Sequence, residues 1–468
     1  MNIIGRKKEI DILGRLSESK RPEFLAVYGR RRTGKTYLIK EYFNGQFAFY
    51  TTGLPNVKTR EQLQVFKDAL VKYGHNDKTI PKNWYEAFSR LREILESDSV
   101  KRDPVTHKKV VFLDELPWMD TARSDFKSAL DYFWNSFGSS MDDLLLIVCG
   151  SATSWIINNI ISDHGGFYNR ITKQIHLHPF TIDECDELLK LNHMELSRRK
   201  VAMCYMIFGG IPYYINLLDN RLSLDQNVDE LIFNPDGELH YEYDRLFKSL
   251  FSKATLHMKI IEILSSKSIG LTRNDLIKYL DSKSGNGIST ALLELEQCGF
   301  IRKYQNFTTS KQNYIYQIID PFTLFCIHYI RKNKVNSWIN ILNTPSYNSW
   351  SGNAFEILCL NHIGKIKEML GISGVESNEY AWRSKESNPG AQIDLIIERR
   401  DDVINLCEMK FSDDEFIIDK KYHQELINKM TAFKNETKTK KAVHITMITI
   451  NGIKKNEYSD VVINQVCL

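Results

Sequence analysis

The chain has 468 residues, of which 43% are hydrophobic and 26% are charged, a composition typical of soluble globular proteins with about three domains. The formal net charge is only +4, so a polyanionic partner would require a local basic patch. The eight cysteines form no Cys-x-x-Cys pair, and no apolar run has the length of a signal peptide core or a membrane span. We therefore expect a soluble cytoplasmic protein that binds no membrane and has neither disulfides nor structural zinc.

The chain begins with a short charged segment and an amphipathic pattern. Gly5-Arg6 is followed by Ile10, Leu13 and Leu16, which are spaced for one face of a helix. Taken alone, this pattern predicts only a helix with a charged start.

A phosphate-binding motif follows. Residues 29–36 fit Gly-x-x-x-x-Gly-Lys-Ser/Thr at every defined position and come directly after the apolar run 24–28. The glycines let successive backbone N–H groups point into one concavity, and the next helix adds its positive dipole end. We expect Lys35 to reach the β- and γ-phosphates of ATP and Thr36 to ligate Mg²⁺. The nucleotide-binding set here is Gly29, Thr33, Gly34, Lys35 and Thr36.

The stretch Val110-Val111-Phe112-Leu113-Asp114-Glu115 predicts a buried parallel strand whose carboxyl end opens onto a site. We expect Asp114 to hold the Mg²⁺ shell through water and Glu115 to polarise the attacking water as general base. A solvated acidic turn after a buried strand is the alternative. The phosphate loop upstream favours the functional interpretation.

Three later positions are weaker candidates. Ser151 or Thr153, after the apolar run 144–148, could sense the γ-phosphate or simply form a turn. Arg170 could stabilise charge on the γ-phosphate, from the same or a neighbouring subunit, or lie on the surface. Pro212 follows two glycines and ends a helix. A role for Arg170 in a neighbouring site would require a homo-oligomer.

The alternation of strands and helices predicts an α/β fold, with a parallel-sheet core over residues 1–180 and a helical lid over 181–250. From Gly5 to about Tyr214 the chain resembles the archaeal-type ATPase family, an AAA-related, signal-transduction branch of the P-loop NTPases. The resemblance rests on residues 28–36, 113–115 and 209–212. It implies that Gly5 and Arg6 lie over the nucleotide base and that Pro212 packs on adenine. It also relates Arg170 to the arginine of a Gly-Arg pair, although Asn169 stands in place of the glycine here.

Residues 251–335 predict a winged helix-turn-helix followed by a linker. Three short helical patterns, the second with Thr272 as N-cap and Asp275 at its third position, precede two alternating stretches that form a hairpin. The polar residues near the start of the third helix are Asn286, Ser289 and Thr290, and the wing adds Arg302, Lys303 and Lys311. Glu294 and Glu296 in the same helix would repel phosphates. DNA contact and a structural or protein-docking role both remain open.

Residues 336–468 contain a second group of polar residues. Glu356 lies in a helix predicted over about 353–370, Asp394 in a strand, and Glu408 and Lys410 on one face of the next strand. Asp394 and Glu408 could share a Mg²⁺ or Mn²⁺ ion, Lys410 could orient the water that attacks a phosphodiester, and Glu356 could add a carboxylate. A charged strand edge is the alternative.

The predicted order of helix, three strands, helix and strand resembles the restriction-endonuclease-like PD-(D/E)XK fold, and more closely the C-terminal domain that often accompanies archaeal-type ATPases. Ile393-Asp394 stands in place of the family's Pro-Asp. The sequence therefore predicts an ATPase that controls a metal-dependent nuclease-like domain acting on nucleic acid, with DNA as the expected partner. The alternative is a nucleotide-switched regulator or scaffold whose C-terminal domain binds nucleic acid or protein without cleaving.

Overall fold

The computed structural model describes residues 3–161, 170–251, 253–281, 285–307, 314–332, 336–384 and 390–468. The chain forms two compact units, Met1–Phe180 and Thr181–Leu468, and each is described by itself. Within the described ranges, no helix is long and apolar enough to cross a membrane.

The first unit is built on a parallel sheet. Its described residues form five strands in the order β2-β3-β4-β1-β5, and every neighbouring pair is parallel. The strands β1, β3 and β4 are almost wholly buried, as expected for a parallel sheet covered on both faces. The strands are β1 (Glu23–Tyr28), β2 (Phe49–Thr52), β3 (Lys109–Asp114), β4 (Leu144–Gly150) and β5 (Lys173–His176).

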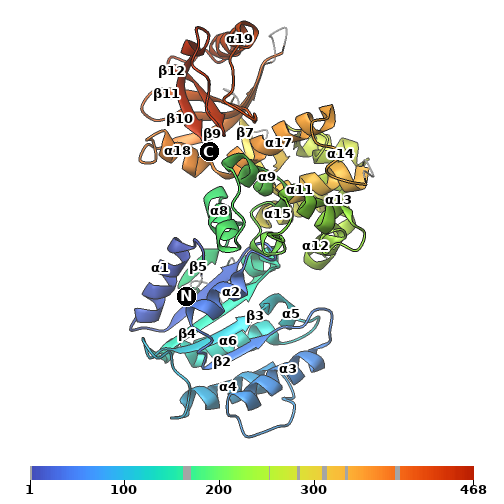
Figure 1. Ribbon diagram of the computed structural model, residues 1–468. Coiled ribbons are helices and arrows are strands. Elements are labelled where there is room, and N and C mark those ends of the chain that lie inside the picture. Colours follow the sequence, from blue (N-terminus) through green and yellow to red (C-terminus); the bar gives the residue numbers. More distant parts are fainter. Residues whose placement is uncertain are drawn as a thin grey trace. The chain divides into compact units, whose positions relative to one another are not determined.

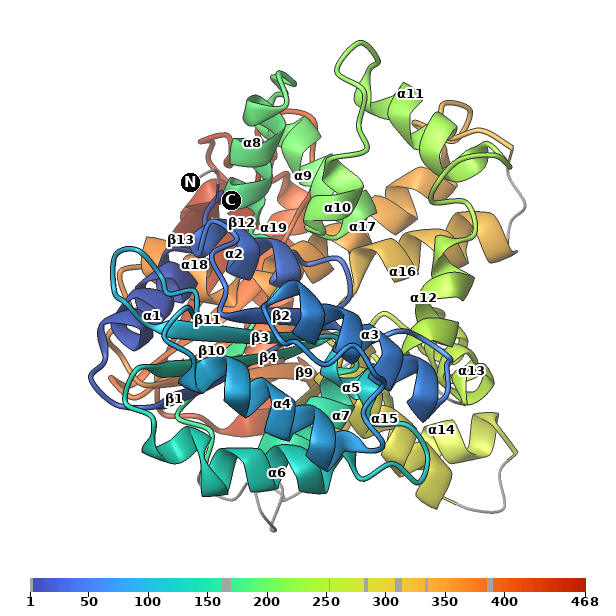
Figure 2. The ribbon, with the colours of Figure 1, turned by 90° about the horizontal axis from the view of Figure 1, so that it is seen from below.

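Helices cover both faces of this sheet. Leu25 and Val27 of β1 pack with the first two helices, whereas Phe24 and Ala26 pack with α3, α4 and α6, which Figures 1 and 2 show running across the other face. The helical segments are α1 (Lys7–Glu18), α2 (Lys35–Tyr42), α3 (Thr59–Lys72), α4 (Trp84–Glu96), α5 (Leu116–Met119), α6 (Phe126–Ser136), η1 (Gly138–Ser140), α7 (Thr153–Ile156) and η2 (Ile157–Ile161).

The second unit begins with helices and contains the three-helix segment expected after residue 251. Thr272 and Asp275 form the predicted capping box at the start of α14. The helical segments over residues 182–297 are α8 (Ile182–Leu191), α9 (Arg198–Phe208), α10 (Pro212–Ile215), α11 (Leu224–Val228), η3 (Asp229–Phe233), α12 (Glu242–Leu250), α13 (Ala254–Leu264), α14 (Arg273–Tyr279) and α15 (Asn286–Gln297).

The C-terminal part follows the predicted order of elements, with two differences: the chain adds a last strand, Val462–Cys467, and the predicted first helix is divided. The helix expected over 353–370 is two helices, α17 (Pro345–Asn361) and α18 (Ile363–Met369). The break falls at His362, whose buried ring accepts a hydrogen bond from the Ile182 backbone N–H (2.8 Å). The remaining helical segments are α16 (Pro321–Phe325), η4 (Cys326–Lys332), α19 (Lys420–Thr437) and η5 (Ser459–Val461).

One mixed sheet runs through the middle and C-terminal segments. Over the described residues it has eight strands in the order β13-β12-β11-β10-β9-β7-β8-β6. The hairpin strands β7 and β8 therefore continue the C-terminal sheet, because β7 pairs in parallel with β9. The strands are β6 (Leu271–Thr272), β7 (Ile301–Asn306), β8 (Tyr314–Ile318), β9 (Ser377–Arg383), β10 (Gln392–Arg399), β11 (Val403–Met409), β12 (Ala442–Thr449) and β13 (Val462–Cys467).

Candidate functional site

The residues predicted to bind nucleotide lie at the carboxyl ends of three adjacent strands. β4 lies between β1 and β3, and all three strands run parallel. The loop after β1, the carboxylates at the end of β3 and Ser151 after β4 therefore meet at one edge of the sheet, where open α/β sheets bind their ligands.

Side chains of the phosphate loop donate hydrogen bonds to the loop's own backbone carbonyls. The Lys35 side chain is buried, and its Nζ donates to the carbonyls of Gly29 and Arg30, both at 2.8 Å. The Thr33 hydroxyl donates to the same Arg30 carbonyl (2.8 Å). Gly34, with φ 91°, is the N-cap of α2. Backbone N–H groups at this helix start can therefore point into the loop.

Thr36 and Asp114 meet directly. The Thr36 hydroxyl lies 2.8 Å and 3.1 Å from the two carboxylate oxygens of Asp114. Burial raises the pKa of Asp114, and Glu115 raises it further, although the Thr36 hydrogen bond lowers it. A hydroxyl and a carboxylate are hard oxygen ligands of the kind that Mg²⁺ takes, so the pair fits a magnesium ion bound with a nucleotide.

Glu115 is held by Ser151. Both the Ser151 hydroxyl and its backbone N–H (3.2 Å) donate to the Glu115 carboxylate. Thr153 is fully buried and its backbone N–H donates to the Ser151 carbonyl (2.9 Å), so Ser151 is the one of the two candidates that contacts Glu115. Gly53, which the sequence did not single out, permits this approach because a Cβ there would lie 2.6 Å from the Glu115 carbonyl oxygen.

Two histidines that sequence reasoning missed lie beside the phosphate loop. The His176 ring stacks on Tyr28 with a centroid distance of 4.9 Å and lies 4.0 Å from the His178 ring. Burial, followed by the charges of His178 and Lys35, lowers the pKa of His176 to about 4. The sequence feature that could have identified them is the His-x-His pair, His176 and His178, at the end of β5, which pairs with the strand that precedes the phosphate loop.

Gly5 and Arg6 lie at the start of α1 in left-handed backbone conformations, with φ of 59° and 53°. The Arg6 guanidinium donates to the Thr33 carbonyl (3.1 Å) and lies 4.6 Å from the centre of the Phe180 ring. Arg6 therefore contacts the phosphate loop itself.

The two remaining nucleotide-site candidates are placed as follows. Arg170 is exposed in the turn before β5, whereas Tyr168 and Asn169 lie outside the described residues. Pro212 is the first residue of α10 in the second unit.

The C-terminal carboxylates lie at neighbouring ends of two paired strands. Leu395 pairs with Cys407 as the last pair in the register of the antiparallel strands β10 and β11, so Asp394 and Glu408 come directly beyond that pair, and burial together with the charge of Glu408 raises the pKa of Asp394. Gln392, two residues before Asp394, donates to its carboxylate.

Glu408 is surrounded by cations. Lys429 of α19 lies 2.7 Å from one of its carboxylate oxygens, and Lys410 lies 3.2 Å from the other. The Tyr422 hydroxyl also donates to Glu408 (2.9 Å). Burial alone would raise the pKa of Glu408, but the two lysines and these hydrogen bonds outweigh it and the pKa is lowered.

Glu356 of α17 is half-buried within electrostatic range of Asp394 and Glu408. Burial, followed by the charges of Asp394 and Glu408, raises the pKa of Glu356 to about 8, and burial also raises the pKa of Asp394. In the described parts of the chain, no three His, Cys, Asp or Glu side chains are arranged to hold a metal ion. The two carboxylates of Asp394 and Glu408 are of the kind that Mg²⁺ takes, since it is usually bound through one or two carboxylates and keeps several waters.

The candidate recognition residues differ in their surroundings. Asn286 and Thr290 are exposed, but the Ser289 hydroxyl accepts a hydrogen bond from Arg273 Nε (2.6 Å). A Glu294 carboxylate oxygen lies 2.7 Å from His257 Nε2 on α13, so this carboxylate contacts another helix of the same unit.

The predicted wing cations also differ in their contacts. Arg302 Nε donates to the Gln317 side chain (2.8 Å), whereas Lys303 lies 3.9 Å from the centre of the Tyr314 ring. Lys311 lies outside the described residues.

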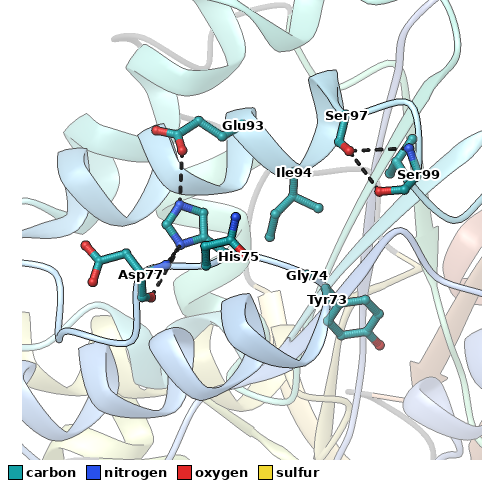
Figure 3. Close-up of a pocket in the computed structure, with 10 residues that line it drawn as sticks. Tyr73, Gly74, His75, Asp77, Glu93, Ile94, Ser97 and Ser99 are labelled. Atoms are coloured by element: carbon teal, nitrogen blue, oxygen red, sulfur yellow. Dashed lines mark hydrogen bonds and ion pairs between the residues drawn. The ribbon is translucent and has the colours of Figure 1, made fainter.

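A cavity of about 380 Å³ lies between the end of α3 and α4 (Figure 3). His75 Nε2 lies 3.1 Å from a Glu93 carboxylate oxygen at its wall. None of the predicted nucleotide residues lines this cavity, so we assign it no part in the nucleotide chemistry.

Comparisons with known proteins agree with the N-terminal geometry. Residues 3–218 match the family described as an ATPase domain predominantly from Archaea. The chain is also 24% identical over 448 residues to the uncharacterized protein MJECL04 of Methanocaldococcus jannaschii, covering 91% of each chain. Residues 3–218 are therefore similar to an archaeal-type ATPase domain.

The chain is also similar to two solved structures. The Walker-type ATPase PABY2304 of Pyrococcus abyssi is 18% identical, with a TM-score of 0.50 over 70% of this chain and 97% of that one. The ORC2 protein of Aeropyrum pernix is 14% identical, with a TM-score of 0.39 over 70% of this chain and 94% of that one. The first likeness agrees with a P-loop NTPase fold built on a parallel sheet.

Proposed function

We propose that the first unit binds and hydrolyses ATP at the edge formed by β1, β3 and β4. The contact between the Thr36 hydroxyl and the Asp114 carboxylate (2.8 Å) carries this proposal, because it joins the phosphate loop to the acidic strand end. Glu115, the next residue, then lies within reach of the γ-phosphate of a nucleotide bound in the loop.

In this proposal the chain's own groups change partners when nucleotide binds. Lys35 leaves the carbonyls of Gly29 and Arg30 for the β- and γ-phosphates. Glu115 accepts a proton from the attacking water, and Ser151 holds the Glu115 carboxylate in position. Thr36, and Asp114 through water, would hold a Mg²⁺ ion, which would supply positive charge against the charge that develops on the phosphate.

Glu115→Gln tests the hydrolytic step. We expect the variant to bind ATP about as tightly as the wild type and to hydrolyse it at least about 100-fold more slowly, since general-base catalysis contributes that much or more. Glu61→Gln, at an exposed position in the first turn of α3, is the control and should hydrolyse normally. Wild-type turnover by Glu115→Gln would exclude Glu115 as the base.

We further propose that the C-terminal part is a PD-(D/E)XK-like domain that hydrolyses phosphodiester bonds in DNA, under control of the ATPase domain. The observation behind this proposal is that Asp394 and Glu408 come directly beyond the Leu395–Cys407 pair of β10 and β11, while Lys410 lies 3.2 Å from Glu408. Lys410 orients the attacking water, and Asp394 with Glu408 would hold one divalent ion that polarises the phosphate. The segment with α13, α14, α15 and the β7–β8 hairpin then serves as a winged helix that contacts the duplex.

The rival function is a nucleotide-switched regulator or scaffold whose last domain binds nucleic acid or protein without cutting. Its support is that Glu408 already has two lysine partners, as a purely structural ion-pair cluster would.

Incubation with labelled linear, circular and single-stranded DNA and with RNA, in Mg²⁺ or Mn²⁺ and with or without ATP, separates the two functions. Cleavage by the wild type and by Lys434→Ala, an exposed position on α19, but not by Lys410→Ala or Asp394→Ala, would support the nuclease. Intact ATP turnover without any cleavage would favour the regulator.

A further inference from the structure

Arg199 lies on α9, a helix that both the ATPase-like segment and the C-terminal unit include. The match to the ATPase family extends to residue 218, beyond the end of this helix. α9 nevertheless belongs to the same compact unit as the C-terminal sheet and packs against α17, which carries Glu356. A side chain on α9 can therefore contact the elements around the C-terminal carboxylates.

The Arg199 guanidinium contacts both α17 and the loop that follows β11. It donates to the Tyr347 hydroxyl of α17 (3.3 Å), forms an ion pair with Asp413 and lies 5.1 Å from the centre of the Phe411 ring. Asp413 is exposed, so the ion pair by itself stabilises little. The Arg199 side chain is only 22% exposed, and a partly desolvated guanidinium beside an aromatic ring is a stronger contact. Arg199 therefore holds mainly the Phe411 ring.

Phe411 connects this contact to the C-terminal site. It directly follows Lys410, whose Nζ lies 3.2 Å from a Glu408 carboxylate oxygen. The Phe411 ring also lies 5.5 Å from the ring of Phe355, a fully buried residue that directly precedes Glu356 on α17. The chain next to Lys410 is thus packed against the chain next to Glu356, and the Arg199 guanidinium contacts the same ring.

Two backbone hydrogen bonds bound the loop that Arg199 contacts. The Lys410 N–H donates to the Ile448 carbonyl (2.9 Å), and the Phe416 N–H donates to the Gly452 carbonyl (2.8 Å). Between these bonds, the Asn451 side chain donates to the backbone carbonyl of residue 413 (2.8 Å). The path of the chain after Lys410 therefore depends on side-chain contacts, among them those of Arg199.

We propose that Arg199 is a positioning residue of the C-terminal site. By holding Phe411 and Asp413, it fixes the chain directly after Lys410 and so the direction of the Lys410 side chain. The inference rests on the proposed nuclease function, in which Lys410 orients the attacking water. A displacement of about 1 Å in such a group can slow a reaction about 100-fold. The segment that matches the ATPase family thus supplies a residue on which the C-terminal site depends.

The test measures single-turnover DNA cleavage by the full chain in saturating Mn²⁺, with DNA binding in Ca²⁺ and thermal unfolding as checks. It compares wild type, Arg199→Gln and Arg199→Lys with Arg198→Gln. Arg198 is the matched control on the same helix, because it pairs with Asp183 (2.8 Å) and donates to the Leu468 carbonyl (3.0 Å).

We expect Arg199→Gln to slow cleavage at least about tenfold while DNA affinity changes less than about threefold, because positioning acts on the chemical step. Arg199→Lys should recover part of the loss, since it keeps the charge beside Asp413 without the planar fork. Arg198→Gln should change both quantities less than about threefold.

Phe411→Leu provides a second variant that tests the route from Arg199 to Lys410. It should also slow cleavage, and adding Arg199→Gln to it should slow cleavage less than about twofold further, because the two residues act through one contact. Losses that multiply in the double variant would overturn the inference.

Amide hydrogen exchange tests the same inference without cleavage. The Lys410 and Phe416 amides should exchange at least about fivefold faster in Arg199→Gln than in the wild type and Arg198→Gln. If the wild type cuts no DNA, the nuclease proposal fails and exchange alone decides the role of Arg199. Unchanged exchange at both amides, or unchanged cleavage by Arg199→Gln where the wild type cuts, would overturn the inference.

Discussion

In the proposed function, Lys35 is the residue on which nucleotide binding depends most. Its Nζ, buried against two loop carbonyls, is the positive charge that the β- and γ-phosphates would meet. We expect Lys35→Ala to weaken ATP binding at least about tenfold and to abolish turnover, as loss of a charged hydrogen-bond donor implies. Isothermal titration with ATP and a phosphate-release assay measure both effects.

Lys40→Ala is the matched control for that prediction, since Lys40 is exposed near the end of the same helix, α2. It should bind and hydrolyse ATP like the wild type. Equal losses in both variants would show that helix α2, rather than the Lys35 charge, was disturbed.

His176 gives the first unit a pH dependence of known sign. Its pKa is about 4 in the folded chain against 6.5 as a free side chain, through burial and then His178 and Lys35. Between these values the unfolded chain binds the proton and the folded chain does not, so stability falls as the pH drops from about 6.5 to about 4. Tyr28 and His178 are the rings against this group. After allowance for partial exposure, we expect a loss of about 1 kcal/mol between pH 7 and pH 5.

Urea unfolding of wild type and His176→Asn at the two pH values measures this loss. Between pH 7 and pH 5, the free energy of unfolding of His176→Asn should fall by about 1 kcal/mol less than that of the wild type. His107→Asn, at an exposed loop position, should show the same pH dependence of stability as the wild type. An identical pH dependence in wild type and His176→Asn would contradict the assignment.

At the scale of elements, the turn from β1 into the phosphate loop depends on Gly29. Its φ of 140° suits glycine, and a Cβ would lie 2.3 Å from the Leu177 carbonyl oxygen, so any side chain must displace the backbone after β5. We expect Gly29→Ala to lower stability by about 2 kcal/mol or more and to weaken ATP binding at least about tenfold.

Gly45→Ala is the control that separates the steric clash at position 29 from the free-energy cost of a left-handed backbone conformation. Gly45 has φ 64° with open space around its Cβ position, so alanine there should cost only about 1 kcal/mol and leave ATP affinity unchanged. Thermal unfolding and ATP titration of both variants measure the difference. Wild-type ATP affinity in Gly29→Ala would show that the loop tolerates the displacement.

Local motifs were predictable because strand, turn and helix signals are adjacent in the chain. The loop 29–36, the strand ending at Asp114 and the Thr272 capping box needed only nearby residues. Choosing Ser151 over Thr153 as the partner of Glu115 required the spatial order of β3 and β4.

Contacts between distant segments were not predictable in this way. A single sequence carries no signal for the parallel pairing of β7 with β9, because strand pairing depends on register across a long separation. Arg302 was therefore predicted as a wing cation for phosphates, yet its Nε donates to Gln317 and its guanidinium lies over the Tyr304 ring. His176 was missed because its importance comes from stacking on β1, a neighbour in space only.

At the scale of the whole molecule, the two proposed activities belong to separate units. The first unit contains most of the segment that matches the archaeal ATPase family, and the second contains Asp394 and Glu408 on β10 and β11, within a sheet that includes the hairpin. Nucleotide at the first site is proposed to control phosphodiester cleavage at the second. This control would operate through populations of conformations that ATP favours or disfavours.

The most direct test measures the rate of DNA cleavage in Mn²⁺ by the wild type and by Glu115→Gln, each with and without ATP. We predict that ATP changes the wild-type rate at least about fivefold, the lower range of allosteric coupling, and that Glu115→Gln holds this changed rate after one addition of ATP, because it binds ATP without consuming it. Cleavage at one rate in all four conditions, with ATP turnover intact in the wild type, would contradict control by the nucleotide.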